Sequence, residues 1–240
     1  VYLGVHELPP ERSPEASPGP GEPMVVMRRM PQARRLSLLL GQGSAAADCV
    51  RDVARQVAAM HAAEEPVHDY GLARTTQALW DEGHEQMRVF AGSIVDDALL
   101  DQVHAAAVEY LRGRGPLLDH REHAGLVRDG HGDLLTDDIF CLDDGPRILD
   151  CLEFDRRLRL GDVLADLAFL AMDLELHGAP ELARLLVDRY RQLDAETHPR
   201  TLEHHYIAYR AFVRSKVECL RHLQGEPDAV GRARALLALA

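Results

Sequence analysis

The sequence predicts an α+β fold that is mostly helical. Apolar residues recur at helical spacing through most of the chain after Pro31. Extended runs are confined to the N-terminal stretch and one central hairpin. A length of 240 residues, with 46% hydrophobic and 28% charged residues, is sufficient for a sizeable buried core. These three observations favour a helical body with a few short strands.

The N-terminal stretch is expected to hold two strands. Residues 1–5 and 24–30 are apolar and strand-like, whereas residues 7–23 are dense in Pro, Gly, Ser and Glu and are expected to form a disordered loop. The character of the sequence changes after Pro31. We therefore expect residues 1–30 to form one unit and residues 31–240 to form a helical unit with a central hairpin.

Helical periodicity then accounts for most of the remaining chain. Ser44 can cap the first long helix. The predicted helices cover residues 44–63, 71–90, 96–113, 162–176, 180–193 and 201–223, with a last one from about 228. The central hairpin is predicted from residues 139–142 and 147–152, joined by the turn sequence Asp143-Asp144-Gly145-Pro146.

Charge and cysteine usage exclude several classes of function. The chain has 27 basic and 39 acidic side chains, a formal net charge of −12, which argues against a nucleic-acid or anionic-membrane partner. No apolar run approaches the roughly 18 to 20 residues of a membrane span. The four cysteines, Cys49, Cys141, Cys151 and Cys219, form no C-x-x-C pair. They are expected to be reduced thiols in a cytoplasmic protein.

Acidic residues are concentrated in the centre of the chain. Residues 131–175 contain twelve Asp or Glu residues and only four Arg residues. Many of these acids lie in predicted loops beside the hairpin, where their carboxylates can converge. Converging carboxylates repel each other unless a cation joins them, and Mg²⁺ suits one or two carboxylates together with phosphate oxygens. The pattern therefore favours phosphoryl transfer.

The spacing of three acids makes this prediction more specific. Asp133 follows His131-Gly132, Asp138 comes five residues later, and Asp150 ends the second predicted strand of the hairpin. This order is typical of kinase-like enzymes. There the first acid orients or deprotonates the attacking hydroxyl, and the other two hold the metal on the nucleotide phosphates.

Several segments resemble one known superfamily. HGDLLTDDIF resembles the catalytic loop of aminoglycoside phosphotransferases and choline kinase-like enzymes, and ILDCLEF with GDVLADLAFLAMDLE resembles their metal-binding segment and following helix. Residues 128–175 are more narrowly similar to the phosphotransferase-like half of bacterial two-part proteins, in which a P-loop ATP-binding half follows. VYLGV and MVVMRRMP resemble the last small-lobe strands and the hinge.

The resemblance implies a protein kinase-like fold, with a C-terminal lobe and a remnant of the N-terminal lobe strands. It implies that the protein transfers the γ-phosphate of ATP, with Mg²⁺ as cofactor, to a hydroxyl of a small molecule. Asp133 takes the catalytic-base position, and His131 braces the loop more than it performs chemistry. Met27 and Arg29 would belong to the hinge, whose backbone meets adenine.

The same resemblance implies the metal ligands. Asp138 takes a position usually held by Asn, and Asp150 takes the second position. Two residues separate Asp150 from Glu153 where the superfamily has one, so Glu153 is the alternative ligand. Asp162 and Asp166 match the helix motif and are expected to accept hydrogen bonds from the backbone of the catalytic loop.

Some parts of a complete kinase are missing. The chain has no lysine before Lys216, no Gly-rich loop and no P-loop motif. Two explanations compete. Either the chain is truncated and starts at the last strands of the small lobe, which is the favoured explanation, or the protein is natively a lobe fragment or a pseudokinase. In isolation it is expected to show little or no phosphotransferase activity. A covalently linked P-loop domain is a possible partner, besides the small-molecule substrate.

Two other functions remain open. One is a catalytically inactive kinase-like module that binds ligand or regulates an adjacent ATP-binding domain. The other is a metal-dependent hydrolase with His131, Asp133, Asp138 and Asp150 as direct ligands, which lacks a second nearby histidine. Arg210, Arg214 and Lys216 on the long helix near the C-terminus could line a substrate cleft, but a solvated helix face is the preferred interpretation.

Overall fold

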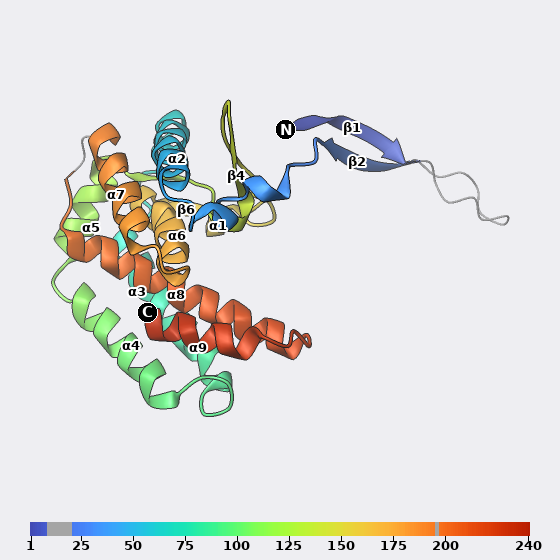
Figure 1. The fold of residues 1–240 in the computed structure, drawn as a ribbon. Helices are drawn as coiled ribbons and strands as arrows, with labels where there is room; N and C mark the ends of the chain where they lie inside the picture. The colour runs from blue at the N-terminus through green and yellow to red at the C-terminus, as the bar shows by residue number, and fades with distance from the viewer. Residues whose placement is uncertain (9–20, 195–196) are drawn as a thin grey trace.

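The computed structural model describes residues 1–8, 21–194 and 197–240. Most of the loop predicted at residues 7–23 lies outside these ranges. The described ends of that segment, residues 7–8 and 21–23, contribute to strands or directly precede one. The fold is mostly helical with short strands, as the sequence predicts (Figure 1).

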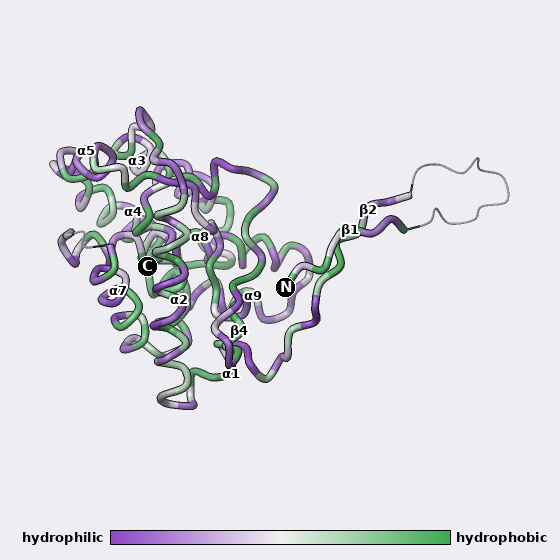
Figure 2. Tube along the Cα trace, turned by 90° about the horizontal axis from the view of Figure 1, so that it is seen from above, coloured by the Kyte–Doolittle hydropathy of each residue, from purple (hydrophilic) through white to green (hydrophobic). Residues whose placement is uncertain are grey.

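The N-terminal strands pair and project from the helical body. β1 (Tyr2–Leu8) runs antiparallel to β2 (Glu22–Met27), and both are exposed along almost their whole length. Figures 1 and 2 show the hairpin extending away from the helices. β2 ends at Met27, earlier than the predicted residue 30. Met27 faces Tyr2, and the last bond runs from the Arg28 amide to the Val1 carbonyl.

Eight helices of nine or more residues form the described part of the body. A short helix, α1 (Leu36–Leu39), precedes them. The predicted set is confirmed as α2 (Ser44–Ala63), α3 (Leu72–Met87), α4 (Asp97–Leu111), α6 (Val163–Leu176), α7 (Pro180–Asp194), α8 (Arg200–Leu223) and α9 (Ala229–Leu239). The sequence does not predict α5 (Gly115–His123), because its buried face carries Arg121 and Glu122 instead of an apolar stripe.

α6 lies in the centre of the core. Eleven of its residues are buried, and it packs against α7 and α8. Leu167 and Leu170 have no exposed surface. Trp80 of α3 is fully buried against Phe212 of α8. Because α6 is fixed on several sides, it provides a rigid base for the loops at its N-terminus.

Two small antiparallel pairs complete the fold. β4 (Ile139–Leu142) and β5 (Gly145–Ile148) form the predicted hairpin, with a turn of two residues instead of four. β3 (Val127–Asp129) pairs with β6 (Leu160–Asp162), a pairing that the sequence does not reveal. This second pair brings the segment after β3 next to the start of α6.

The prediction of four reduced thiols is wrong for one pair. Cys49 of α2 and Cys141 of β4 form a disulfide across a sequence separation of 92 residues. Packing of the hairpin against α2 brings their Cα atoms to 5.7 Å, a proximity that scattered positions in the sequence conceal. Cys151 and Cys219 are free thiols. No helix among the described residues is both long and apolar enough to cross a membrane.

Candidate active site

The loop between β3 and the hairpin is fastened to the first turn of α6. The Asp166 carboxylate accepts backbone hydrogen bonds from His131 and Gly132 over 2.9 and 2.8 Å. A Cβ atom at Gly130 would lie 2.8 Å from this carboxylate, and Gly132 has a φ of +85°, which favours glycine. The glycines around His131 therefore allow the loop to lie directly on Asp166.

Asp166 is itself held by a residue that sequence analysis missed. His61 on α2 donates from Nε2 to Asp166 Oδ2 over 3.0 Å, and its Nδ1 lies 2.8 Å from the Tyr190 hydroxyl. Asp166 is fully buried, but hydrogen bonds from His61 and the loop amides outweigh burial and lower its pKa to about 2. Asp166 therefore makes the loop contacts expected of it, and nothing in the spacing of His61 indicated this connection.

His131 makes a second contact that holds the loop in place. Its ring is buried and donates from Nε2 to the Leu149 carbonyl over 2.9 Å, which joins the loop to the end of β5. Nδ1 is buried and, within the described residues, has no hydrogen-bond partner. The contact is that of a side chain that positions the loop.

The expected role of Asp162 is not observed. Its carboxylate caps α6 through the Leu164 amide, forms a buried bidentate ion pair with Arg121 and accepts a hydrogen bond from the Tyr206 hydroxyl. None of these partners belongs to the loop after β3. Asp162 ends β6, one turn before Asp166, so its side chain points toward α5 and α8 instead.

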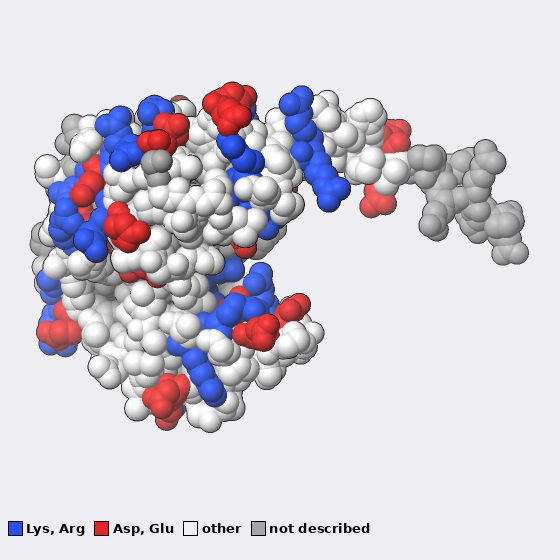
Figure 3. Space-filling view, in the orientation of Figure 1, with Lys and Arg blue, Asp and Glu red and all other residues white. Residues whose placement is uncertain are grey.

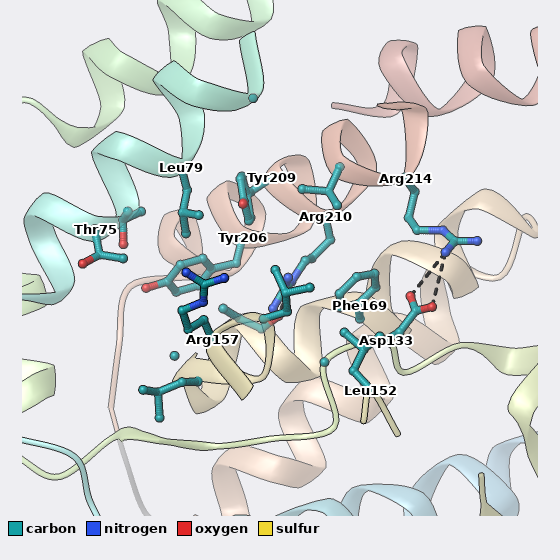
Figure 4. Close-up of a pocket in the computed structure, with 18 of the residues that line it drawn as sticks. Thr75, Leu79, Asp133, Leu152, Arg157, Phe169, Tyr206, Tyr209, Arg210 and Arg214 are labelled. Carbon is teal, nitrogen blue, oxygen red and sulfur yellow. Dashed lines mark hydrogen bonds and ion pairs between the residues drawn. The ribbon is translucent and has the colours of Figure 1, made fainter. Parts of the chain in front are cut away.

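Asp133 lies at the end of the fastened loop and faces a cavity. Burial raises the pKa of its carboxyl, although the nearby Arg214, His131 and Arg210 act in the opposite direction. Arg214 of α8 forms an ion pair with it at 3.3 Å (Figure 4). A partly buried carboxylate of raised pKa is more basic than an exposed one, as the acceptor of a hydroxyl proton should be.

Asp138 and Asp150 lie together at one end of the hairpin. The Leu149 amide donates to the Asp138 carbonyl over 3.0 Å, so the two strands hold Asp138 beside the residue that precedes Asp150. Asp150 adopts a φ of +63°, a sparsely populated conformation that clusters at functional sites. Burial raises the pKa of Asp138 to about 6, assisted by the negative charges of Asp150, Asp133 and Asp137. Carboxylates in this arrangement favour a bound cation.

The donor set fits a metal ion that is shared with a ligand. No group of three or more His, Cys, Asp or Glu side chains in the described parts of the chain is arranged to hold a metal ion alone. Mg²⁺ commonly uses one or two carboxylates and completes its shell with water and substrate phosphates. Asp138 and Asp150 would supply the two carboxylates. Glu153 is exposed and is not among the largest influences on the pKa of Asp138.

A cavity of about 560 Å³ adjoins Asp133. Its walls come from α3, α6, α8 and the segment after β5, and Figure 4 shows Phe169, Tyr206 and Tyr209 around it. Arg210, Arg214 and Lys216 line it, so the preferred interpretation of a solvated helix face is wrong for these three. The face of α8 that carries them turns toward α3 and α6. Figure 3 shows the body hollowed on the side below the N-terminal hairpin.

The expected hinge residues lie apart from this cavity. Met27 ends β2 and Arg29 lies two residues later, and both side chains are exposed. Neither residue lines the cavity beside Asp133. Met30, by contrast, is buried and marks the point where the chain enters the body.

Sequence comparisons find similar proteins in mycobacteria. No family model matches this chain. Uncharacterized proteins of Mycobacterium tuberculosis and Mycobacterium bovis are 36% identical over 235 residues, which is 97% of this chain and 46% of theirs. The chain therefore spans about half the length of these relatives.

Structural comparisons identify the fold. A glucosamine kinase matches 93% of this chain with a TM-score of 0.63 and 17% identity, and the match covers 59% of that kinase. A glucosamine kinase in complex with glucosamine, ADP and inorganic phosphate matches 87% of this chain with a TM-score of 0.60. The choline kinase of Cryptosporidium parvum matches 93% of it, and 70% of its own length, with a TM-score of 0.58 and 13% identity. The chain thus has the kinase-like fold that the sequence predicts.

Proposed function

We propose that this chain is the catalytic lobe of an ATP- and Mg²⁺-dependent phosphotransferase of the aminoglycoside phosphotransferase type, which acts on a hydroxyl of a small molecule. The observation that carries the proposal is the proximity of Asp138 to Asp150 and Asp133, whose negative charges help to raise the pKa of Asp138, together with the position of Asp133 on the cavity wall. Mg²⁺ would neutralise the nucleotide phosphates there. The similar structures include small-molecule kinases, one of them with ADP bound.

Each residue has a defined task in this proposal. Asp133 accepts the proton of the substrate hydroxyl, which enters from the cavity. Asp138 and Asp150 hold the metal, and Asp150 is preferred over Glu153 because its charge acts on Asp138. His131 and Asp166 position the loop through the hydrogen bonds described above. Met27 and Arg29 remain proposed hinge residues.

A second candidate is a kinase-like module without catalytic activity. No lysine precedes Lys216 in the given sequence, and an inactive module requires that the whole protein also lacks the lysine with which kinases hold the nucleotide phosphates. We propose in either case that the whole protein includes a P-loop ATP-binding domain, since the relatives are about twice as long as the matched segment. A cytoplasmic location stays a prediction, and the pairing of Cys49 with Cys141 removes the support that four reduced thiols gave it.

The two candidates differ in an assay of ADP formation by the full-length protein. ATP is supplied with and without Mg²⁺, together with glucosamine, choline and neutral or anionic small alcohols. Mg²⁺-dependent ADP formation that rises with an added alcohol, and that Asp138→Ala abolishes but Glu153→Ala does not, supports the phosphotransferase. Nucleotide binding without any alcohol-dependent turnover would instead support the inactive module.

A further inference from the structure

The cavity beside Asp133 has a charge pattern that bears on the substrate. We propose that the acceptor carries an anionic group, either a carboxylate or a phosphate monoester, which Lys216 and Arg210 recognise. This inference rests on the proposed function for the acceptor hydroxyl and adds the chemical class of the molecule that bears it.

Most charged side chains of the cavity wall already form ion pairs with other side chains of the protein. The wall includes five cationic side chains, Arg157, Arg210, Arg214, Lys216 and Arg221, and three acidic ones, Glu82, Asp133 and Asp162. Ion pairs join Arg214 to Asp133, Arg157 to Asp155, Arg221 to Glu218 and Arg121 to Asp162. In the described parts of the chain, Arg210 and Lys216 take part in no ion pair.

Lys216 is the only lysine of the chain, and it faces the cavity. Its Nζ donates to the neutral Gln86 Oε1 of α3 over 2.6 Å. Burial lowers the pKa of Lys216, although the charge of Glu82 acts in the opposite direction. Removing an ammonium from water without a paired anion is unfavourable, and a ligand oxyanion would restore that lost stabilisation. The side chain is therefore suited to meet an anion from the cavity.

Arg210 lies on the same helix and is held flat. Its Nε donates to the Ala165 carbonyl over 2.8 Å, and its guanidinium stacks over the Phe169 ring at 4.2 Å. Within the described residues its two terminal nitrogens have no hydrogen-bond partner. A fixed planar guanidinium with both terminal nitrogens open can bind a carboxylate or phosphate through two parallel hydrogen bonds. Figure 4 shows Arg210 between Tyr209 and Phe169 on the cavity wall.

The position of these two cations fits a small acceptor. On α8, Arg214 contacts Asp133, Arg210 lies one turn before it, and Lys216 lies half a turn after it. At about 1.5 Å of rise per residue, their backbone positions lie about 6 and 3 Å along the helix axis from that of Arg214. Because Arg210, Lys216 and Asp133 line the same cavity of about 560 Å³, a small molecule whose anionic group meets either cation can direct its hydroxyl toward Asp133. The rings of Tyr206 and Tyr209 offer an apolar wall beside it.

The test uses four matched alcohols that share one ring and one hydroxymethyl group. They are para-hydroxymethyl benzoate, para-hydroxymethylphenyl phosphate, the neutral para-methylbenzyl alcohol and the cationic para-hydroxymethyl benzylamine. Calorimetry measures their binding to the full-length protein without nucleotide or Mg²⁺. We expect at least one anion to bind about tenfold more tightly than the neutral alcohol, as a charged hydrogen bond implies. Comparison of the two anions shows whether carboxylate or phosphate is preferred.

Variants of Lys216 test whether the cavity causes the preference for anionic alcohols. Lys216→Met should reduce the anion preference about tenfold, Lys216→Arg should retain it, and the exposed Arg88→Gln should leave it unchanged. Equal or tighter binding of the neutral or cationic alcohol, absence of binding by all four, or an unaltered preference in Lys216→Met would overturn the proposal. Because the assay needs no phosphoryl transfer, its result is independent of whether the protein proves to be a phosphotransferase.

Discussion

The Arg214 guanidinium lies 3.3 Å from the Asp133 carboxylate, and this pair joins the loop after β3 to α8 at the cavity wall. Burial raises the pKa of Asp133, while Arg214 is the largest of the charges that oppose this rise. The proton affinity of Asp133 thus depends on a residue 81 positions away in sequence.

Removal of this cation should make Asp133 more basic. In Arg214→Gln, the pKa of Asp133 rises further, because the largest charge that lowers it is removed while burial still raises it. Since Asp133 must be deprotonated to accept a proton, activity at acidic pH should fall severalfold and recover as the pH rises. Carbon NMR titration of the Asp133 carboxyl measures the shift directly. An identical titration in the variant and in Arg88→Gln would contradict the role assigned to Arg214.

Asp166 should contribute to stability in a pH-dependent way. Its pKa is about 2 in the folded protein against 3.8 as its ordinary value. A lowered pKa contributes stability that is present above pH ~4 and lost as the pH falls toward ~2, and the difference corresponds to about 2 kcal/mol. Asp166→Asn should therefore lower the free energy of unfolding at pH 7 by at least this amount, because an amide cannot accept all three hydrogen bonds.

Urea unfolding at pH 7 and pH 3 checks this expectation. The difference in stability between wild type and Asp166→Asn should shrink at pH 3, where the carboxylate begins to lose its advantage. Glu85→Gln is the control, because Glu85 is exposed on α3. A difference that stays constant with pH would show that Asp166 does not have its lowered pKa.

Gly130, which follows β3, should not tolerate a side chain. Gly161 in β6 should tolerate one. A Cβ at position 130 would lie 2.8 Å from the Asp166 carboxylate, but a Cβ at position 161 meets nothing within 4 Å. Gly130→Ala should cost about 1 to 3 kcal/mol of stability by overpacking and displace the loop that carries Asp133. Gly161→Ala should be close to neutral. Thermal unfolding of both variants measures the contrast, and equal melting temperatures would refute the close approach of loop and helix.

Asp138 should destabilise the folded protein when no metal is bound. Its pKa is about 6, above its ordinary value of 3.8, so the folded state holds the proton more strongly than the unfolded state. The resulting stability is present below pH ~4 and lost as the pH rises through 6, a loss of about 1 to 2 kcal/mol after allowance for partial exposure. In Asp138→Asn the neutral amide removes this cost. The variant should be more stable than wild type at pH 8 and equal to it near pH 4.

Denaturant unfolding without divalent cations tests this expectation. The matched control is Glu153→Gln, which removes an exposed acid that is not among the largest influences on the pKa of Asp138. Addition of Mg²⁺ with ADP should raise the melting temperature of wild type more than that of Asp138→Asn. An Asp138→Asn protein that is less stable at pH 8 would contradict the repulsion among Asp133, Asp138 and Asp150.

The sequence predicted those features that depend on neighbouring residues. Helical periodicity located α2 to within a residue, and α6 through α9 almost as closely, because their apolar stripes are read over consecutive turns. The spacing of Asp133, Asp138 and Asp150 also located a coherent acidic site, since a short loop and one hairpin place all three. α5 escaped prediction because its buried positions are charged.

Features that depend on distant segments could not be predicted. His61 reaches Asp166 across 105 residues, and Cys49 reaches Cys141 across 92, so no local pattern marks either contact. The orientation of α8 decides that Arg214 and Lys216 line the cavity instead of facing solvent. Asp162 matched a motif, yet its side chain is engaged by Arg121 and Tyr206. Tertiary packing determines these contacts.

The central claim is that Asp133 accepts the proton of the acceptor hydroxyl during phosphoryl transfer. It is tested most directly by the single-turnover rate of labelled phosphate transfer from ATP and Mg²⁺ to an alcohol, measured with full-length wild-type protein and with Asp133→Asn. Nucleotide binding is measured alongside to show that the variant remains folded. We predict that Asp133→Asn lowers the rate about a hundredfold or more with nucleotide binding retained. A variant that transfers phosphate at the wild-type rate would contradict the account.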